Sequence, residues 1–397
     1  MLGLLFIGVG IGALAFAALA EKKKSDDSIK APTTLQGAEY PRIHSDGRVT
    51  FRVFAPNAQR VRVIAPLGKT ENNGYNGLGE EPYEMAKDEA GFWWVTTPPV
   101  VPGFHHYYLD VDGAQFCDPG SKTYASRNLR SSGIDIPEPG VDFYDIKDVP
   151  HGEVRKRWYF SRVTNQWRRV LVYTPPNYDD DQDQRYPVLY LRHGGGENED
   201  AWYDRAKANF ILDNLIAEGK AKPMIIVMNN NYADTPSQAF QLPDQPPPHE
   251  ISEITIKELI PMIDSTYRTI ADRDHRAMAG LSMGSVQTLY IGLPNLDTFS
   301  ALGVFSRRPM SPEEFKYFDP YFEDPESFNS NVHLFWWGAG TAEEGIYNAA
   351  KKNLQELEEK GINSVFVEFP GLSHEWQAWR KSLYDYAQRL FRWSSIV

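Results

Sequence analysis

The chain has 397 residues, of which 42% are hydrophobic and 24% charged, a globular composition with material for two domains or one large one. Its net charge of −12 argues against a nucleic-acid-binding protein, because contacts to phosphate need a basic face. The single cysteine, Cys117, excludes an intrachain disulfide. Its 10 Trp, 21 Tyr and 21 Phe provide core residues and also suit sugar binding, in which flat rings stack on pyranose faces.

The chain begins with an apolar segment. Residues 2–20 are apolar or small and end in Ala18-Leu19-Ala20, a small-x-small pattern typical of a signal-peptidase site. No basic residue precedes this run and three lysines follow it, opposite to the usual orientation bias, so an uncleaved membrane anchor is the alternative. We favour a signal peptide over residues 1–20, hence a secreted or periplasmic/cell-surface protein, and a flexible leader over 21–35.

Residues 36–135 have the pattern of a small all-β domain. Period-two alternation predicts strands at 49–54, 60–64, 91–96 and 105–111, the last followed by an Asp112-Gly113 hairpin turn. Residues 71–82 form a predicted loop between them. Regular strands without a helical segment indicate an antiparallel, immunoglobulin-like sandwich. A proline-containing linker is predicted over 136–155.

Residues 156–397 change to alternating strands and helices. A hairpin is predicted from 156–163 and 166–173. Further strands are predicted at 187–191, 224–228, 275–279, 300–305, 332–337 and 364–369, and helices at 208–218, 251–266, 286–293, 345–360 and 376–392. This order predicts a mostly parallel sheet covered on both faces, the layout of an α/β-hydrolase. The irregular segment 229–250 follows a strand and is expected beside the active site.

The segment Gly280-Leu281-Ser282-Met283-Gly284 has the Gly-x-Ser-x-Gly spacing of a nucleophile elbow. Such an elbow is a sharp turn between a strand and a helix, and the flanking residues provide both. The glycines are needed because larger side chains two residues from the serine would collide across the turn. Ser282 is therefore the predicted nucleophile.

A serine nucleophile needs a base, an acid and donors for the oxyanion. In α/β-hydrolases the order is serine, acid, histidine, and only His333 and His374 follow Ser282. His333 lies within a predicted buried strand and is expected to be structural, whereas His374 follows a strand and is the predicted base. The acid is Glu343 or Glu344, either of which could instead serve the N-terminus of the next helix.

The predicted oxyanion donors are backbone N–H groups. The glycine-rich loop His193-Gly194-Gly195-Gly196 follows a buried strand, an arrangement whose amides face a carbonyl oxygen in α/β-hydrolases. Gly195, Gly196 and Met283 are the predicted donors. No metal or organic cofactor is implied by this chemistry.

Two resemblances to known families extend this interpretation. Phe51–Ala58, Gly91-Phe92-Trp93 and Pro102–Tyr108 resemble a family 48 carbohydrate-binding module. Residues 150–393 resemble carbohydrate esterase family 1, the feruloyl and acetyl-xylan esterases. The residues that match are the glycine-rich loop with Trp202, the elbow, Gly303–Ser306, and His374 with Trp376 and Trp379. In that family the acid follows Gly-Thr-x, which implies Glu343. The resemblance also implies Trp202 and Trp376 as candidates for substrate contact.

The chain departs from the esterase pattern at three places. Ser285 replaces a usual glycine, Glu343 replaces a usual aspartate, and Arg307-Arg308 replace two glycines. We expect Arg307 or Arg308 to contact an acidic or polar part of the substrate, such as a uronic-acid branch, and a solvated loop is the alternative.

The motifs predict a serine esterase that works by two-step acyl transfer, and the resemblance implies that it releases ferulate from feruloylated (arabino)xylan. The alternatives are an acetyl-xylan esterase and a carbohydrate-binding protein with a degenerate esterase domain. The expected partner is the polysaccharide, feruloylated or acetylated xylan. Nucleic acid is not expected, and a membrane only if the N-terminal segment stays uncleaved.

Overall fold

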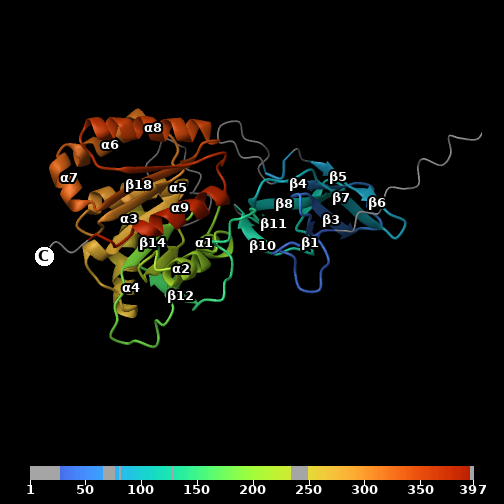
Figure 1. Cartoon of the computed structure of the whole chain (residues 1–397), viewed down its shortest axis with the longest axis horizontal. Coiled ribbons are helices and arrows are strands. Elements are labelled where there is room, and N and C mark those ends of the chain that lie inside the picture. The colour runs from blue at the N-terminus through green and yellow to red at the C-terminus, as the bar shows by residue number, and fades with distance from the viewer. Residues whose placement is uncertain (1–26, 66–76, 80–81, 127–128, 234–248, 394–397) are drawn as a thin grey trace, which may run out of the picture.

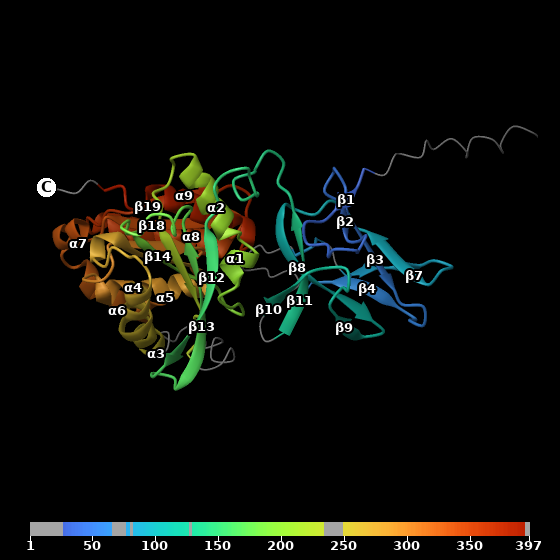
Figure 2. The ribbon, with the colours of Figure 1, turned by 90° about the horizontal axis from the view of Figure 1, so that it is seen from below.

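The computed structural model describes residues 27–65, 77–79, 82–126, 129–233 and 249–393. The predicted signal peptide or anchor, most of the predicted loop at 71–82, and residues 234–248 of the irregular segment lie outside the described residues. No helix in the described part of the chain is long and apolar enough to span a bilayer. A β-sandwich and an α/β domain lie end to end along the long axis (Figures 1 and 2).

The sandwich consists of two antiparallel sheets. The first has the order β1-β2-β3-β7-β6, with β1 (Ile29–Lys30), β2 (Arg42–Ile43), β3 (Val49–Phe54), β7 (Phe92–Thr96) and β6 (Ala86–Lys87). The second has the order β10-β11-β8-β4-β5, with β9 also paired to β8. Its strands are β10 (Thr123–Ser126), β11 (Leu129–Ile136), β8 (Gly103–Val111), β4 (Val61–Ile64), β5 (Tyr83–Glu84) and β9 (Ala114–Phe116).

The alternation in the sequence correctly identifies the inner face of the sandwich. Val49 and Phe51 of β3 are buried against Val61 and Val63 of β4, as the period-two pattern predicts. The start of the sandwich differs from the prediction, because β1 lies within the predicted leader and pairs with β2. Ala31 is also buried there, so the leader is shorter than the sequence indicated.

The α/β domain is built on an eight-stranded sheet with the order β12-β13-β15-β14-β16-β17-β18-β19. Strands β12 and β13 form the predicted antiparallel hairpin, β13 is antiparallel to β15, and the other neighbours are parallel. The strands are β12 (Glu153–Ser161), β13 (Gln166–Thr174), β14 (Val188–Arg192), β15 (Ile225–Asn229), β16 (Arg276–Leu281), β17 (Ala301–Phe305), β18 (Leu334–Gly340) and β19 (Val365–Phe369).

Helices cover both faces of this sheet, as expected for an α/β-hydrolase (Figure 1). One face packs against α1 (Ala201–Asp204), α2 (Ala208–Ala217) and α9 (Trp376–Arg389). The other packs against a helical segment formed by α3 (His249–Glu253), a π-helix (Ile254–Leu259) and α4 (Ile260–Thr266), and against α5 (Met283–Gly292), α6 (Pro312–Phe318), α7 (Pro325–Asn331) and α8 (Glu344–Glu359). The predicted fold class is confirmed.

The two domains share a polar, buried interface. Asp135 of β11 accepts hydrogen bonds from both terminal nitrogens of Arg380 in α9, at 2.9 and 3.0 Å, and also pairs with Lys207 at 2.8 Å. Beside this cluster Tyr144, from the predicted linker 136–155, is buried with the Arg380 guanidinium over its ring. The linker has no helix or strand from 137 to 152, and this contact packs it against the α/β domain.

We expect Asp135→Asn to destabilise the protein by about 3–5 kcal/mol, since the substitution leaves Arg380 buried without its carboxylate. Burial alone would raise the pKa of Asp135, but Arg380 and Lys207 outweigh it and hold the pKa below its usual value. The stabilisation is therefore present above the unfolded pKa of about 4 and is lost as the pH falls towards the folded pKa.

Thermal unfolding at several pH values tests this expectation. The difference in Tm between the wild type and Asp135→Asn should be largest near neutral pH and should shrink below about pH 4. Glu138→Gln is the control, because the Glu138–Lys381 pair is partly exposed and should contribute at most about 1 kcal/mol. Equal losses in both variants at neutral pH would contradict the assigned role of Asp135.

Candidate active site

The loops that follow four parallel strands meet at one edge of the sheet. They follow β14, β16, β18 and β19, whose last residues are Arg192, Leu281, Gly340 and Phe369. Every predicted catalytic and oxyanion residue lies on one of these loops or at the start of the helix that follows. The parallel register thus gathers groups that are far apart in sequence, as open α/β sheets do at their carboxyl edge.

Ser282 lies in a strained turn between β16 and α5. Its backbone has φ 50° and ψ −115°, which is unusual for a residue with a side chain. A Cβ on Gly280 would lie 2.5 Å from the carbonyl carbon of Gly284, and one on Gly284 would lie 2.6 Å from the carbonyl oxygen of His193. Gly280 is therefore required by the tightness of the turn itself, and Gly284 by the close packing of the turn against the β14 loop.

Three predicted residues form one hydrogen-bonded chain. The Nε2 of His374 lies 3.0 Å from the Oγ of Ser282, and its Nδ1 lies 2.7 Å from the Oε2 of Glu343. Glu343 is fully buried, whereas the His374 side chain is 15% exposed. With Nδ1 donating to the carboxylate, Nε2 is left to accept the serine proton. Glu344 begins α8 and has no part in this chain.

The second carboxylate oxygen of Glu343 is also fixed. Its Oε1 accepts hydrogen bonds from the Ser306 hydroxyl at 2.7 Å and the Gly340 N–H at 2.8 Å. The Trp379 indole in turn donates to the Ser306 hydroxyl at 3.1 Å, and its ring packs edge-on to His374. Ser306 and Trp379 therefore orient the acid and the base, a role that the sequence analysis did not assign to either residue.

The predicted oxyanion donors differ in their availability. Nothing in the described part of the chain accepts from the N–H of Gly195 or from that of Met283, the first residue of α5. The Gly196 N–H instead donates to the Tyr232 hydroxyl at 2.5 Å. Gly195 and Met283 thus have free donors beside Ser282, and the prediction for Gly196 is corrected because Tyr232 occupies its donor.

A neutral histidine holds the glycine-rich loop. Burial lowers the pKa of His193 to about 3, so its ring carries one proton at neutral pH. Nδ1 lies 2.8 Å from the Gly194 carbonyl, and Nε2 accepts from the Asn231 N–H at 3.0 Å. Asn231 and Tyr232 belong to the segment predicted as irregular, and they contact the predicted oxyanion loop directly.

Glu197 links this loop to the sandwich domain. Its carboxylate accepts from the Gly194 N–H at 3.0 Å and lies 3.7 Å from Arg205, which also donates to the Ala125 carbonyl of β10. Burial raises the pKa of Glu197, and the Arg205 guanidinium opposes this rise. A continuous set of buried polar contacts therefore runs from β10 to the loop beside Ser282.

Arg307 and Arg308 belong to one ion-pair cluster. Both bind the Glu314 carboxylate, Arg307 through a fully buried side chain at 2.8 Å and Arg308 at 2.7 Å. Burial lowers the pKa of Arg307 to about 10, with Glu314 opposing the shift, so the group stays cationic and paired. Glu314 lies in the first turn of α6, a helix that was not predicted from the sequence. Burial therefore excludes Arg307 from substrate contact, whereas the Arg308 side chain is 27% exposed and its contact with the substrate stays a prediction.

Trp202 and Trp376 are also internal. Trp202 is buried and its indole donates to the Arg192 carbonyl at 3.0 Å, while its ring packs edge-on to Trp376. Both side chains support the base of the active-site loops. Neither has the exposed face needed for substrate contact, so this prediction is also corrected.

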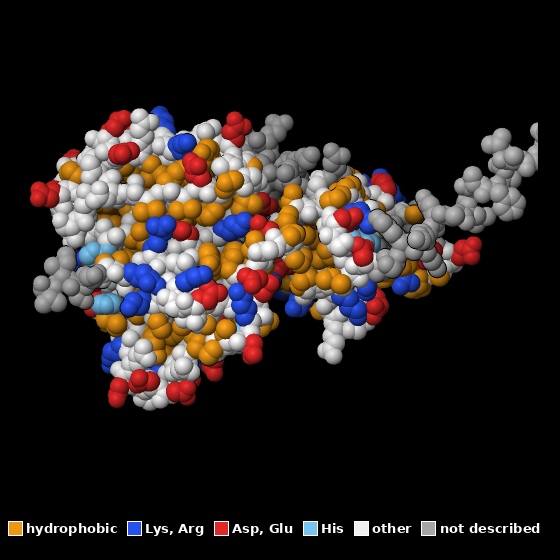
Figure 3. Space-filling model, in the orientation of Figure 1, with side chains coloured by type: hydrophobic (Ala, Val, Ile, Leu, Met, Phe, Trp, Pro, Cys, Tyr) orange, Lys and Arg blue, Asp and Glu red, His pale blue; other side chains and the backbone are white. Residues whose placement is uncertain are grey.

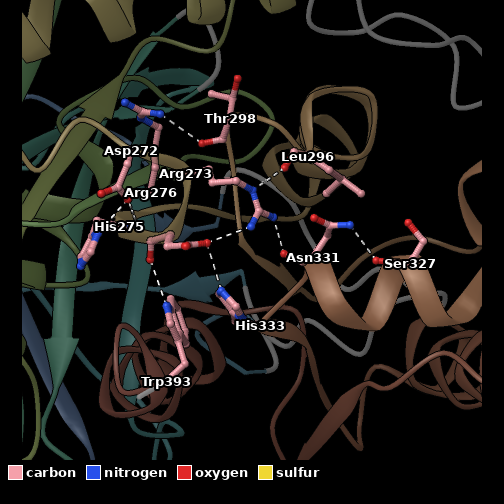
Figure 4. Close-up of polar contacts among 11 residues, drawn as sticks. Asp272, Arg273, His275, Arg276, Leu296, Thr298, Ser327, Asn331, His333 and Trp393 are labelled. Atoms are coloured by element: carbon pink, nitrogen blue, oxygen red, sulfur yellow. Dashed lines mark hydrogen bonds and ion pairs between the residues drawn. The ribbon is translucent and has the colours of Figure 1, made fainter. Parts of the chain in front are cut away.

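His333 lies at the opposite end of the sheet from Ser282, just before β18. Its Nε2 lies 3.0 Å from Asp274, and its ring stacks on Trp393 (Figure 4). The Trp393 indole donates to the Asp274 carbonyl, which closes a local cluster. The expected structural role of His333 agrees with these contacts.

Comparison with known proteins assigns the family. Residues 161–390, more than half of the chain, match the family model described as "Putative esterase". The chain belongs to this esterase family. Residues 37–126 match the model of carbohydrate-binding module 48 (isoamylase N-terminal domain). The families predicted from the sequence are therefore confirmed.

Two named relatives share sequence with this esterase over part of their length. An endo-1,4-beta-xylanase/feruloyl esterase of Xylanibacter ruminicola is 38% identical over 383 residues, which are 95% of this chain and 49% of that protein. An endo-1,4-beta-xylanase Y of Acetivibrio thermocellus is 31% identical over 171 residues, 40% of this chain and 14% of that protein. The esterase thus spans about half or less of the length of these relatives.

Solved structures of other esterases have a similar fold. The CE1 ferulic acid esterase of Anaeromyces mucronatus superposes with a TM-score of 0.54 at 27% identity, covering 63% of this chain and 96% of that one. The enterobactin esterase of Shigella flexneri has a TM-score of 0.64 at 16% identity and covers 92% of this chain and 97% of that one. The second likeness shows that the fold of both domains occurs together elsewhere.

Proposed function

We propose that this esterase releases ferulate from feruloylated arabinoxylan, with Ser282 as nucleophile, His374 as base and Glu343 as the acid that orients it. The observation that carries the proposal is the chain Ser282–His374–Glu343, with distances of 3.0 and 2.7 Å, at the carboxyl edge of an esterase sheet. The names of the relatives, a xylanase/feruloyl esterase and a ferulic acid esterase, support the acyl group and the polysaccharide.

In the proposed mechanism, His374 accepts the Ser282 proton at Nε2 while Oγ attacks the ester carbonyl carbon. The N–H groups of Met283 and Gly195 stabilise the negative oxygen of the tetrahedral intermediate. Its collapse breaks the bond to the sugar oxygen, which takes the proton from His374 and leaves as an alcohol. Water then attacks the acyl-serine by the same route, and ferulate is released.

The polymer substrate favours action outside the cytoplasm, so we propose export, in keeping with the small-x-small pattern at residues 18–20. The surface charge fits a neutral polysaccharide better than a nucleic acid. On the face in Figure 3, acidic and basic side chains are interspersed over both domains and form no broad basic area.

The acyl group is tested by comparing methyl ferulate with acetylated xylan. We expect ferulate release with a kcat/KM well above that for acetate release. The reverse order would assign an acetyl-xylan esterase, and no hydrolysis of either substrate would favour a carbohydrate-binding protein with a degenerate esterase domain.

A further inference from the structure

The β12–β13 hairpin carries exposed aromatic side chains. Trp158, Phe160 and Trp167 are 58%, 45% and 67% exposed, which is unusual for such large apolar groups. Phe160 lies directly opposite Trp167, and Trp158 directly opposite Arg169. Because side chains alternate along a strand and paired residues share a face, all four lie on one face of the hairpin.

A cleft of about 250 Å³ opens on this face, and we call it the hairpin cleft. Its aromatic wall is formed by Trp158 and Trp167, and the Phe160 ring packs edge-on to Trp167. Its polar residues include Arg169, Glu199, Asn230 and Tyr232.

Two arginines, Arg168 and Arg169, line the polar side of the hairpin cleft. Arg168 is buried, and its guanidinium donates to the backbone carbonyls of Asn230, Tyr232 and Ala233. Arg169 is bound to both Glu199 and Asp200, and the Asn230 side chain donates to Glu199 at 3.2 Å. The cation is thus neutralised by two carboxylates, so a phosphate or carboxylate ligand would meet no free partner at Arg169. Flat rings beside amide, guanidinium and carboxylate groups suit a neutral ligand with many hydroxyls.

The cleft lies at the same sheet edge as Ser282. Val170 pairs with Asn229 in the antiparallel β13–β15 ladder, so the beginning of β13 meets the carboxyl end of β15. The hairpin lies at one side of the sheet, where β12 is the outermost strand (Figure 2). Tyr232 lines the cleft and also accepts from the Gly196 N–H beside Ser282. Three strand spacings separate β13 from β16, about 14–15 Å, which a few sugar residues would span.

We propose that the hairpin cleft binds neutral pyranose rings of the polysaccharide main chain while the ester lies at Ser282. The C–H faces of the sugars stack on Trp158 and Trp167, and their hydroxyls bond the paired polar groups. This inference rests on the proposed function, because it assumes that the ester is carried by a polymer.

The first test compares polymer and small substrate in the Trp158→Ala/Trp167→Ala double variant. We expect kcat/KM on feruloylated arabinoxylan to fall about tenfold or more, as loss of two stacking contacts implies, with kcat/KM on methyl ferulate unchanged. Trp158→Phe/Trp167→Phe retains the rings and should keep most of the polymer activity. Tyr317→Ala, which removes an exposed aromatic on α6, is the control and should change neither value. Equal losses on both substrates would overturn the proposal.

The second test measures binding without turnover. In a Ser282→Ala background, the affinity for arabinoxylan stripped of ferulate should fall when Trp158 and Trp167 are also replaced by alanine. Unchanged affinity would overturn the hairpin cleft even if the wild type releases ferulate. Reduced affinity in a protein that hydrolyses no ester would retain the cleft and reject the proposed function. A wild-type dimer in light scattering that the double alanine variant converts to a monomer would instead assign this face to a second copy of the chain.

Discussion

Replacing Ser282 with alanine should lower kcat on methyl ferulate by about 10⁴- to 10⁶-fold, because the proposed acyl intermediate forms on the hydroxyl that this change removes. His374 would keep its hydrogen bond to Glu343, but its Nε2 would lose the hydroxyl that now lies 3.0 Å away. Initial rates at saturating substrate measure the loss, and thermal unfolding checks that the variant remains folded.

Ser285→Ala provides a matched control within the same turn. The Ser285 hydroxyl is buried and donates to the Ser282 carbonyl at 2.5 Å, so it does not reach the substrate. We expect the kcat of this variant to remain within about tenfold of the wild type, because one neutral hydrogen bond is lost. Losses of similar size in both variants would contradict the assignment of Ser282 as the nucleophile.

Glu343→Gln should lower kcat by about 10³- to 10⁴-fold with little effect on KM. The glutamine oxygen would accept the bonds from Ser306 and Gly340, which leaves the amide nitrogen towards Nδ1 of His374. Nδ1 must then be an acceptor and Nε2 carries the proton, so the histidine can no longer accept one from Ser282. The pH profile of kcat and a steady-state KM separate this effect from misfolding.

Glu343→Asp tests whether the longer acid belongs to this backbone. Strand β18 ends at Gly340, and the Gly340 N–H already binds the Glu343 carboxylate, so the loop is shaped around the extra methylene. We expect a loss in kcat of at least about tenfold, since a carboxylate one bond shorter cannot reach His374 and Ser306 together. Activity equal to the wild type would show that the acid is not positioned as described.

Much of the fold could be predicted from local sequence patterns. Alternation in Val49–Phe54 predicted β3 because the buried side chains of this strand lie on one face. The spacing after Ser282 predicted α5, although the structure buries this helix on almost every side.

The strand before the acid was predicted at 332–337 but spans Leu334–Gly340. Its end was missed because Gly338 and Gly340 interrupt the apolar run by which the strand was predicted. Strands β10 and β11 were not predicted, because Ser131 and Ser132 are polar yet buried. Ser131 is hydrogen-bonded to His106 of the neighbouring strand β8, and Ser132 accepts from the Asp118 N–H.

The candidate site was predictable where chain order and glycine spacing constrain it. Ser282, His374 and Glu343 follow the order of an α/β-hydrolase, and the structure brings them within hydrogen-bond distance. Roles that depend on tertiary contacts were not predictable. Glu314 neutralises Arg307 from a helix missed in the sequence, and Tyr232 reaches Gly196 from another loop.

Liquid chromatography of the ferulate released from feruloylated arabinoxylan is the decisive test of the proposed function. The wild type should release free ferulate, and Ser282→Ala should release none above the rate without protein. Acetate release without ferulate, or equal ferulate release by both proteins, would contradict the proposed function.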